Sequence, residues 1–151
     1  CRKELFLAQE GHGASLNGRT IEVSSRRRQN EALVATAFPW RERALLSRYL
    51  EAFTRVFTKV SDIRRGGSAA LDLAYDASGR CDGFWEVGLS PWDIAAGQLL
   101  VKEAGGHISD FTGGENHIWV GDVVAGNPSI HGFLLGIIQE VFRGNVSEPR
   151  A

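Results

Sequence analysis

Residues 83–106 read GFWEVGLSPWDIAAGQLLVKEAGG, and this stretch holds a strand, a short turn and a helix in succession. Phe84–Val87 predicts the strand, and Ser90 followed by Pro91 is typical of the first turn of a helix. Apolar residues then recur at helical spacing as far as Gly105 and Gly106, where the helix is expected to end.

The same pattern occurs immediately upstream. Residues 62–65 predict a short extended segment that closes at Gly66-Gly67. Ser68 is placed as the N-cap of a helix over residues 69–75, and Gly79 fits the end of that helix. Strand, turn, helix and glycine stop therefore recur twice in succession.

The remaining segments extend this alternation. Asn17-Gly18 predicts a two-residue hairpin turn near the start of the chain. Strands are expected at 32–38, 107–109, 118–120 and 123–125, and helices at 41–58 and from 127–129 to about 143. The sequence therefore predicts one layered α/β domain, without a linker or an internal repeat.

The composition restricts the class of protein. The chain has 151 residues, of which 43% are hydrophobic, and 17 basic side chains against 18 acidic ones give a net charge of −1. Such a balance favours a packed globular core and argues against charge-driven binding to nucleic acid or a membrane. Arg26–Arg28 is best interpreted as a solvated loop.

Cys1 and Cys81 are the only cysteines, and the four histidines lack metal-ligand spacing. A disulfide framework and a zinc site are therefore not indicated, and a cytoplasmic location is expected. We expect no signal peptide or membrane span. Because the chain begins with Cys1 and contains no methionine, its first residue is expected not to be the one at which translation began.

Asp93 and Glu86 are the first candidate functional residues. Asp93 falls in the first turn of the predicted helix, where a carboxylate can simply complement the helix dipole. Glu86 ends the preceding strand seven residues earlier, so the turn could bring both carboxylates to one rim. Hard oxygen ligands of this kind suit Mg²⁺. Neither interpretation excludes the other.

Gly66-Gly67-Ser68 is the second candidate. The backbone amides of a turn between a strand and a helix can bind an anion or a substrate oxygen. An ordinary tight turn with an N-cap is the simpler interpretation, and the pattern lacks the lysine of a phosphate-binding P-loop. The histidines are interpreted as surface or turn residues, and Trp85 and Trp92 as core anchors.

Three longer strings resemble one family. They are RRGGSAALDLAY at 64–75, GRCDGFWE at 79–86 and PWDIAAG at 91–97, and the match continues through 4–6, 11–18, 103–106, 110–114 and 125–128. Together they closely resemble the inositol monophosphatase family, and its bacterial members in particular. The Trp-Asp-Ile-Ala-Ala-Gly element is specific to this superfamily of metal-dependent phosphatases.

The resemblance implies a layered α-β-α-β-α sandwich of the sugar-phosphatase type, of which this chain matches the carboxy-terminal portion. The family's first metal-binding motif, Asp-Pro-x-Asp-Gly-Thr, does not occur in residues 1–151 and would precede Cys1. Residues 1–151 are therefore expected to form the carboxy-terminal part of such a domain. The missing amino-terminal half is then a partner of this segment, and the segment alone is expected to be inactive.

The family's site residues are carried over by position. Asp93 matches the catalytic aspartate that ligates Mg²⁺ beside the bridging oxygen of the substrate, and Glu86 matches the residue that accepts hydrogen bonds from inositol hydroxyls. Gly67, Ser68 and Ala69 match the turn that contacts the inositol ring. The resemblance implies metal-assisted hydrolysis of inositol 1-phosphate, inhibited by lithium. At Asp76 relatives usually carry a small apolar residue.

Alternatives remain open at this point. Sibling families hydrolyse other sugar phosphates or nucleotides, although Glu86 favours a polyol. Some bacterial relatives act with the transcription machinery, and such a role would run through protein surfaces rather than direct contact with nucleic acid. A third possibility is a structural half-domain with an exposed apolar face. Homodimers are usual in the family.

Overall fold

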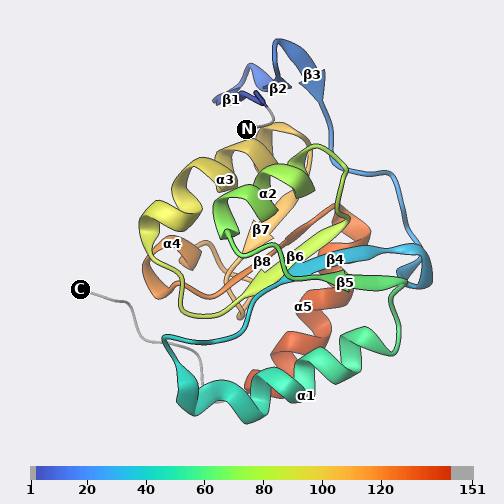
Figure 1. Ribbon diagram of the computed structural model, residues 1–151, viewed down its shortest axis with the longest axis vertical. Helices are drawn as coiled ribbons and strands as arrows, with labels where there is room; N and C mark the ends of the chain where they lie inside the picture. The colour runs from blue at the N-terminus through green and yellow to red at the C-terminus, as the bar shows by residue number, and fades with distance from the viewer. Residues whose placement is uncertain (1–2, 144–151) are drawn as a thin grey trace.

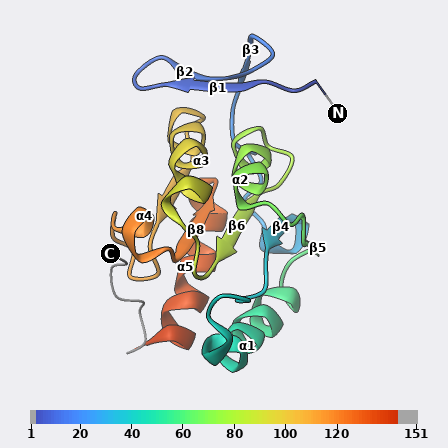
Figure 2. The ribbon, with the colours of Figure 1, turned by 60° about the vertical axis from the view of Figure 1, so that its left-hand side comes forward.

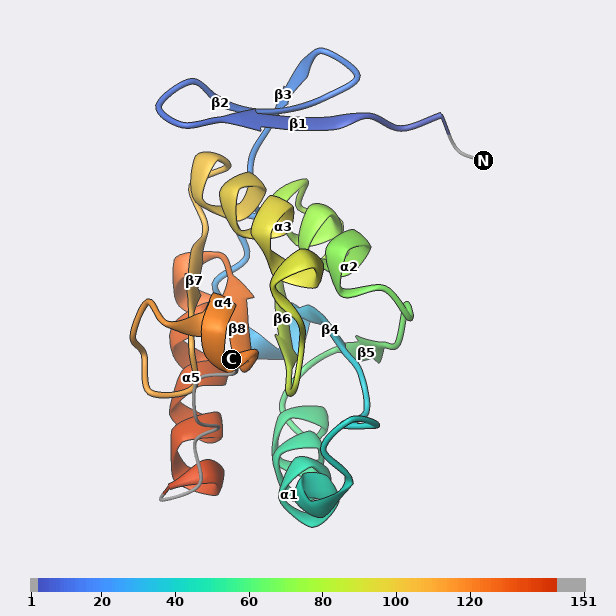
Figure 3. The same cartoon turned by 90° about the vertical axis from the view of Figure 1, so that its left-hand side faces the viewer.

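The computed structural model describes residues 3–143, which form four layers. A small three-stranded sheet lies over helices α2 and α3, a five-stranded sheet follows, and helices α1 and α5 cover its other face (Figure 3). This arrangement confirms the predicted mixed α/β layered fold. Cys1 and the residues after Arg143 lie outside the described residues.

The five-stranded sheet positions most of the loops discussed below. Its order is β5-β4-β6-β8-β7, with β4 parallel to β5 and β6, and β8 antiparallel to β6 and β7. The strands are β4 Leu33–Thr36, β5 Asp62–Arg64, β6 Gly83–Glu86, β7 His107–Ser109 and β8 Val123–Gly126.

Helices cover both faces of this sheet (Figure 1). Their bounds are α1 Leu46–Phe57, α2 Ala69–Ala77, α3 Pro91–Glu103, α4 His117–Val120 and α5 Pro128–Phe142, with short 3-10 turns η1 Gln29–Glu31 and η2 Arg43–Leu45. Successive side chains of β6 point to opposite faces. Phe84 therefore joins the core under α2 and α3, and Trp85 joins the core against α1 and α5.

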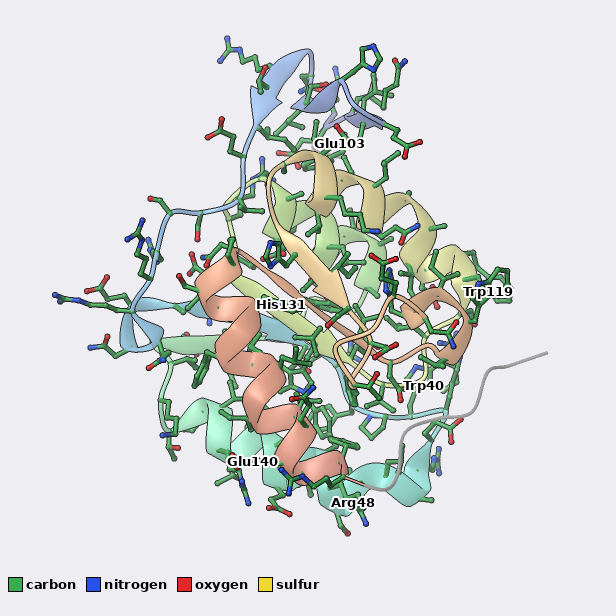
Figure 4. All side chains as sticks on the ribbon, turned by 180° about the vertical axis from the view of Figure 1, so that it is seen from behind. Trp40, Arg48, Glu103, Trp119, His131 and Glu140 are labelled. Carbon is green, nitrogen blue, oxygen red and sulfur yellow. The ribbon has the colours of Figure 1, made fainter. Side chains whose placement is uncertain are left out.

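The small sheet consists of β1 Phe6–Gln9, β2 Gly13–Leu16 and β3 Arg19–Ile21. The predicted turn at Asn17-Gly18 is confirmed, since both residues have positive φ, at 51° and 77°. The carboxylate of Glu103, at the end of α3, accepts the backbone N–H groups of Gly11 and Gly13 at 2.9 and 2.7 Å. Figure 2 shows the sheet lying across the ends of α2 and α3, and Figure 4 marks Glu103 beneath it.

Several predictions are wrong in detail. Residues 118–120 are helical rather than extended, because Asn116 and His117 accept hydrogen bonds from Val120 and Gly121 and the turn ends at Gly121 with φ at 80°. The helix expected over 41–58 begins its α-helical part only at Leu46. Trp92 is 77% exposed and is not a core anchor.

Two of the four histidines are buried, which corrects their assignment to the surface. His117 shares a 2.8 Å hydrogen bond with Gln98, and His131, marked in Figure 4, shares one of 2.9 Å with Ser109. Burial, and secondarily His107, lowers the pKa of His131 to about 4. Burial disfavours the charged imidazolium, so both histidines are expected to be uncharged at neutral pH. A neutral imidazole with a hydrogen-bond partner can be buried in the core.

Asp76 is an acidic side chain enclosed in the core. It lies on the buried face of α2, and neither carboxylate oxygen has a hydrogen-bond partner among the described residues. Burial, together with the nearby charge of Asp82, raises the pKa of the Asp76 carboxyl well above its ordinary value. The helix face packs despite this polar residue, at an electrostatic cost.

Asp76→Asn should raise the free energy of unfolding at about pH 8 and change it least near pH 4. The folded protein keeps the Asp76 proton at pH values where the unfolded chain has lost it. The unfolded state then binds fewer protons, so stability falls as the pH rises from about 4 toward the folded pKa. Asparagine removes this loss, which is up to about 1.4 kcal/mol per pH unit.

Urea denaturation of the purified protein at several pH values measures the effect. Asp62→Asn is the control, because the half-exposed Asp62 pairs with Arg64 and its pKa is lowered. That pairing stabilises the fold above the unfolded pKa and is lost as the pH falls, so the control should shift stability in the opposite direction. An Asp76→Asn profile parallel to wild type would show that Asp76 is not protonated in the fold.

Candidate functional site

A hollow of about 220 Å³ opens at one edge of the five-stranded sheet. All five residues predicted for the site line it: Gly67, Ser68, Ala69, Glu86 and Asp93. Gly67, Ser68 and Ala69 lie between β5 and the first residue of α2, Glu86 ends β6, and Asp93 lies in the first turn of α3. The loop after β4 contributes Trp40 and Arg41.

The sheet topology explains why these segments meet. Strand β4 lies between β5 and β6 and runs parallel to both, so the carboxyl ends of the three strands lie at the same edge. Ligands of open α/β sheets bind at that edge, in the crevice beyond the strands. Residues separated by more than fifty positions in the chain are thereby brought to one hollow.

Asp93 is fixed by the start of α3. Its Oδ2 accepts the backbone N–H of Ser90 at 3.0 Å, and Arg41 Nη1 lies 3.6 Å from the same oxygen. Among the described residues no hydrogen-bond donor is bound to Oδ1. The helix start therefore holds one carboxylate oxygen in place while the other is available for a ligand.

Glu86 ends β6 and is only 6% exposed. Its Oε2 is buried and has no hydrogen-bond partner among the described residues, although the side chain lines the hollow. The pKa of the Glu86 carboxyl is raised to about 7, first by burial and then by the charges of Asp72 and Asp93. An unpartnered carboxylate at the wall of a hollow is suited to accept a hydroxyl or amine donor from a ligand.

The turn from Gly67 to Ala69 forms another wall. Gly67 has a φ of 94°, a conformation that favours glycine, and Ala69 is the first residue of α2. Ser68 occupies the predicted N-cap position, but its side chain makes no capping hydrogen bond. The Ser68 hydroxyl and the free amides at the start of α2 can therefore bind a ligand oxygen.

Two arginines of the hollow were not predicted. Arg65 directly precedes the glycine pair, and its Nη1 lies so close to Gly67 that a Cβ there would be 2.8 Å away. Arg41 lies over the ring of Trp40, with its Cζ 4.2 Å from the ring centroid. The sequence did contain one indication of their role. Each arginine lies just after a strand whose carboxyl end is at this edge, which is where ligands bind in such sheets.

The hollow thus combines two carboxylates with two guanidinium groups. Oxygen ligands such as Asp93 and Glu86 suit a hard cation, and guanidinium groups suit phosphate or carboxylate. Within residues 3–143 no group of three or more His, Cys, Asp or Glu side chains is arranged to hold a metal ion. None of the helices in this range is long and apolar enough to cross a bilayer.

Comparison with known proteins identifies relatives. The model of the inositol monophosphatase family matches residues 1–143. The chain is 52% identical over 129 residues to the Nus factor SuhB of Salmonella typhimurium, covering 85% of this chain and 48% of that protein. It is 45% identical over 137 residues to an inositol-1-monophosphatase of Mesorhizobium japonicum, covering 91% and 52%.

The fold is also found in solved structures. The extragenic suppressor protein suhB of Bartonella henselae superposes with a TM-score of 0.87 at 44% identity, covering 91% of this chain and 52% of that one. The chain spans about half the length of these relatives.

The titration of Glu86 tests the electrostatics of the hollow. In the metal-free protein its carboxyl carbon should titrate by NMR with a midpoint of about 7. Arg65→Gln should move the midpoint higher, because the guanidinium of Arg65 favours the ionised form. Glu103 serves as an internal control, since the hydrogen bonds from Gly11 and Gly13 lower its pKa. A Glu86 midpoint near 4.5 would contradict the burial of this group.

Proposed function

This chain belongs to the inositol monophosphatase family, and from that premise we propose that the protein hydrolyses inositol 1-phosphate to inositol and phosphate with Mg²⁺. One observation carries the proposal. The turn Gly67–Ala69, Glu86 and Asp93, which the resemblance assigns to the family's site, line a single hollow at the carboxyl ends of neighbouring strands. The same hollow offers contacts for a phosphate, a polyol and a cation.

The donor atoms fit part of a Mg²⁺ site. Asp93 offers its free Oδ1 from a rigid helix start, and Glu86, whose buried Oε2 has no hydrogen-bond partner among the described residues, lines the same hollow. Mg²⁺ requires a near-octahedral set of oxygen ligands, more than this chain supplies by itself. Asp93 is therefore proposed as one metal ligand, with others from outside the chain, from water and from the phosphate.

We propose further that residues 1–151 act as the carboxy-terminal part of a longer phosphatase domain. The curated relatives are about twice as long as the matched region. Leu5, directly before β1, is 67% exposed, and Leu7, within β1, is 62% exposed. Together they form an apolar surface that further structure would cover. Residues 1–151 alone are accordingly expected to release no phosphate.

In the proposed reaction each residue has a limited task. Bound Mg²⁺ would supply a water of lowered pKa and neutralise charge on the leaving oxygen. Asp93 holds its carboxylate at the position set by the Ser90 N–H. Glu86 accepts a hydrogen bond from a hydroxyl of the polyol, and Ser68 with the amides at the start of α2 orients the ring. Inhibition by lithium and a cytoplasmic location are parts of the same proposal.

A second candidate function is a role with the transcription machinery. It is favoured by the 52% identity to a protein named a Nus factor, compared with 45% to one named an inositol-1-monophosphatase. With a net charge of −1, such a role would use contacts with proteins rather than with nucleic acid. A homodimer is part of the proposal, and another sugar phosphate or a nucleotide is the alternative substrate.

Asp93→Asn should lower kcat for Mg²⁺-dependent phosphate release by about a hundredfold or more, because the amide is a poor ligand for the metal. The fold should persist, since the amide oxygen can still accept the Ser90 N–H. Phosphate release and circular dichroism measure the two effects, both on the purified full-length protein, because residues 1–151 alone are expected to release no phosphate. Glu140→Gln, which alters a surface ion pair with Arg55, is the control.

Wild-type turnover in Asp93→Asn would exclude the metal role. The same variant separates the two candidate functions. Binding to purified RNA polymerase should survive the substitution if the protein acts through its surface, and hydrolysis should not.

Glu86→Gln tests the substrate class. Glutamine keeps only one acceptor oxygen and loses the negative charge that strengthens a hydrogen bond, so KM for inositol 1-phosphate should rise by about tenfold. KM for p-nitrophenyl phosphate, which has no polyol, should change little. Steady-state kinetics with both substrates, and with a nucleotide and fructose bisphosphate, provide the measurement. A strong preference of the wild-type protein for the nucleotide would defeat the assignment to inositol.

A further inference from the structure

Arg41 occupies a distinctive position in the hollow. It lies in the loop after β4, its guanidinium pairs with Asp93 at 3.6 Å, and its side chain is 33% exposed. The pairing uses Oδ2, the oxygen that also accepts the Ser90 N–H, and leaves Oδ1 uncovered. A positive side chain therefore already lies beside the carboxylate that is proposed to bind a divalent cation.

Two cations compete for one carboxylate. A guanidinium that remains beside Asp93 would repel a divalent cation bound to the same group, so Arg41 must weaken cation binding while it stays there. The ion pair is long and partly solvated, and such pairs are weak. A bound cation can therefore displace Arg41 without disturbing the helix start, because the Ser90 N–H still holds Asp93.

Displacement leaves Arg41 available to an anion. Its planar fork matches two oxygens of a phosphate, and the Trp40 ring provides a surface along which the guanidinium can lie. A phosphate bound next to Asp93 would be within reach of the side chain, because Arg41 already contacts Asp93. Arg65, the other arginine of the hollow, makes no ion pair with a carboxylate of the described residues.

We propose that Arg41 is a phosphate-contacting residue that exchanges partners: it neutralises Asp93 in the empty site and binds the phosphate of the substrate once a metal occupies Asp93. The inference rests on the proposed metal role of Asp93. It makes the binding of metal and phosphate mutually favourable, since each ligand removes a cost that Arg41 imposes on the other. The site therefore binds the metal most tightly when the substrate is present.

Electron paramagnetic resonance tests this coupling with Mn²⁺ as the metal and inorganic phosphate as the anion. In the purified full-length protein, Arg41→Gln should bind Mn²⁺ about fivefold more tightly in the absence of phosphate, because the competing charge is gone. The increase in Mn²⁺ affinity that phosphate produces should shrink by a similar factor. A residue with only a structural role would weaken both measurements or change neither.

Two further variants sharpen the result. Arg43→Gln removes the same charge two residues away, from a side chain that makes no ion pair with a described carboxylate, and should leave both measurements at wild type. Arg41→Lys keeps the charge without the planar fork. It should bind Mn²⁺ alone as wild type does and retain only part of the coupling to phosphate.

The outcomes separate this inference from the proposed function. If Arg41→Gln shows wild-type Mn²⁺ affinity and wild-type coupling while inositol 1-phosphate is hydrolysed, the role of Arg41 is wrong and the function stands. If the coupling changes as expected but the full-length protein hydrolyses no inositol 1-phosphate, the function is wrong and Arg41 keeps its role. A wild-type protein that binds no Mn²⁺ overturns both.

Discussion

Strand β4 lies between β5 and β6 and runs parallel to both, and the candidate site depends on this one constraint. Parallel neighbours place their carboxyl ends at a common edge, so the three loops that follow them must meet there. Antiparallel β8 and β7 complete the sheet without adding loops to that hollow. The core on each face holds the edge rigid, because the β6 side chains Phe84 and Trp85 are fully buried on opposite sides.

The first turns of α2 and α3 supply the groups at this edge that can bind a ligand. Gly67 to Ala69 open α2 with free amides, and Asp93 is fixed at the start of α3 by the Ser90 N–H. Positions at the first turn of a helix are both rigid and electropositive, which suits ligands that bear negative charge. The remaining charge of the hollow is balanced, since Arg41 and Arg65 face Glu86 and Asp93.

Buried acidic groups carry an energetic cost in this fold, and they are of two kinds. Glu86 is buried at the wall of the hollow, where an unpartnered oxygen can be satisfied by a ligand. Asp76 is enclosed within the core and does not line the hollow, so no ligand there compensates its burial. The first is typical of functional sites, at which stability is sacrificed for binding. The resemblance to the family led us to expect a small apolar residue at this position, and nothing in the structure explains the presence of Asp76.

The sequence by itself determined the alternation of strands and helices, the hairpin at Asn17-Gly18, the family, and five of the residues that line the hollow. These signals are local. Apolar periodicity, glycine stops and motif strings can be recognised from neighbouring residues alone, without knowledge of the fold. Residues 118–120 escaped prediction, because a short apolar run suits a strand or a helical turn equally. Only the hydrogen bonds from Val120 to Asn116 and from Gly121 to His117 decide. The two arginines that share the hollow with Glu86 and Asp93 escaped prediction as well. Arg41 and Arg65 reach the hollow only because parallel strands bring distant loops together, and that proximity is a property of the tertiary structure alone.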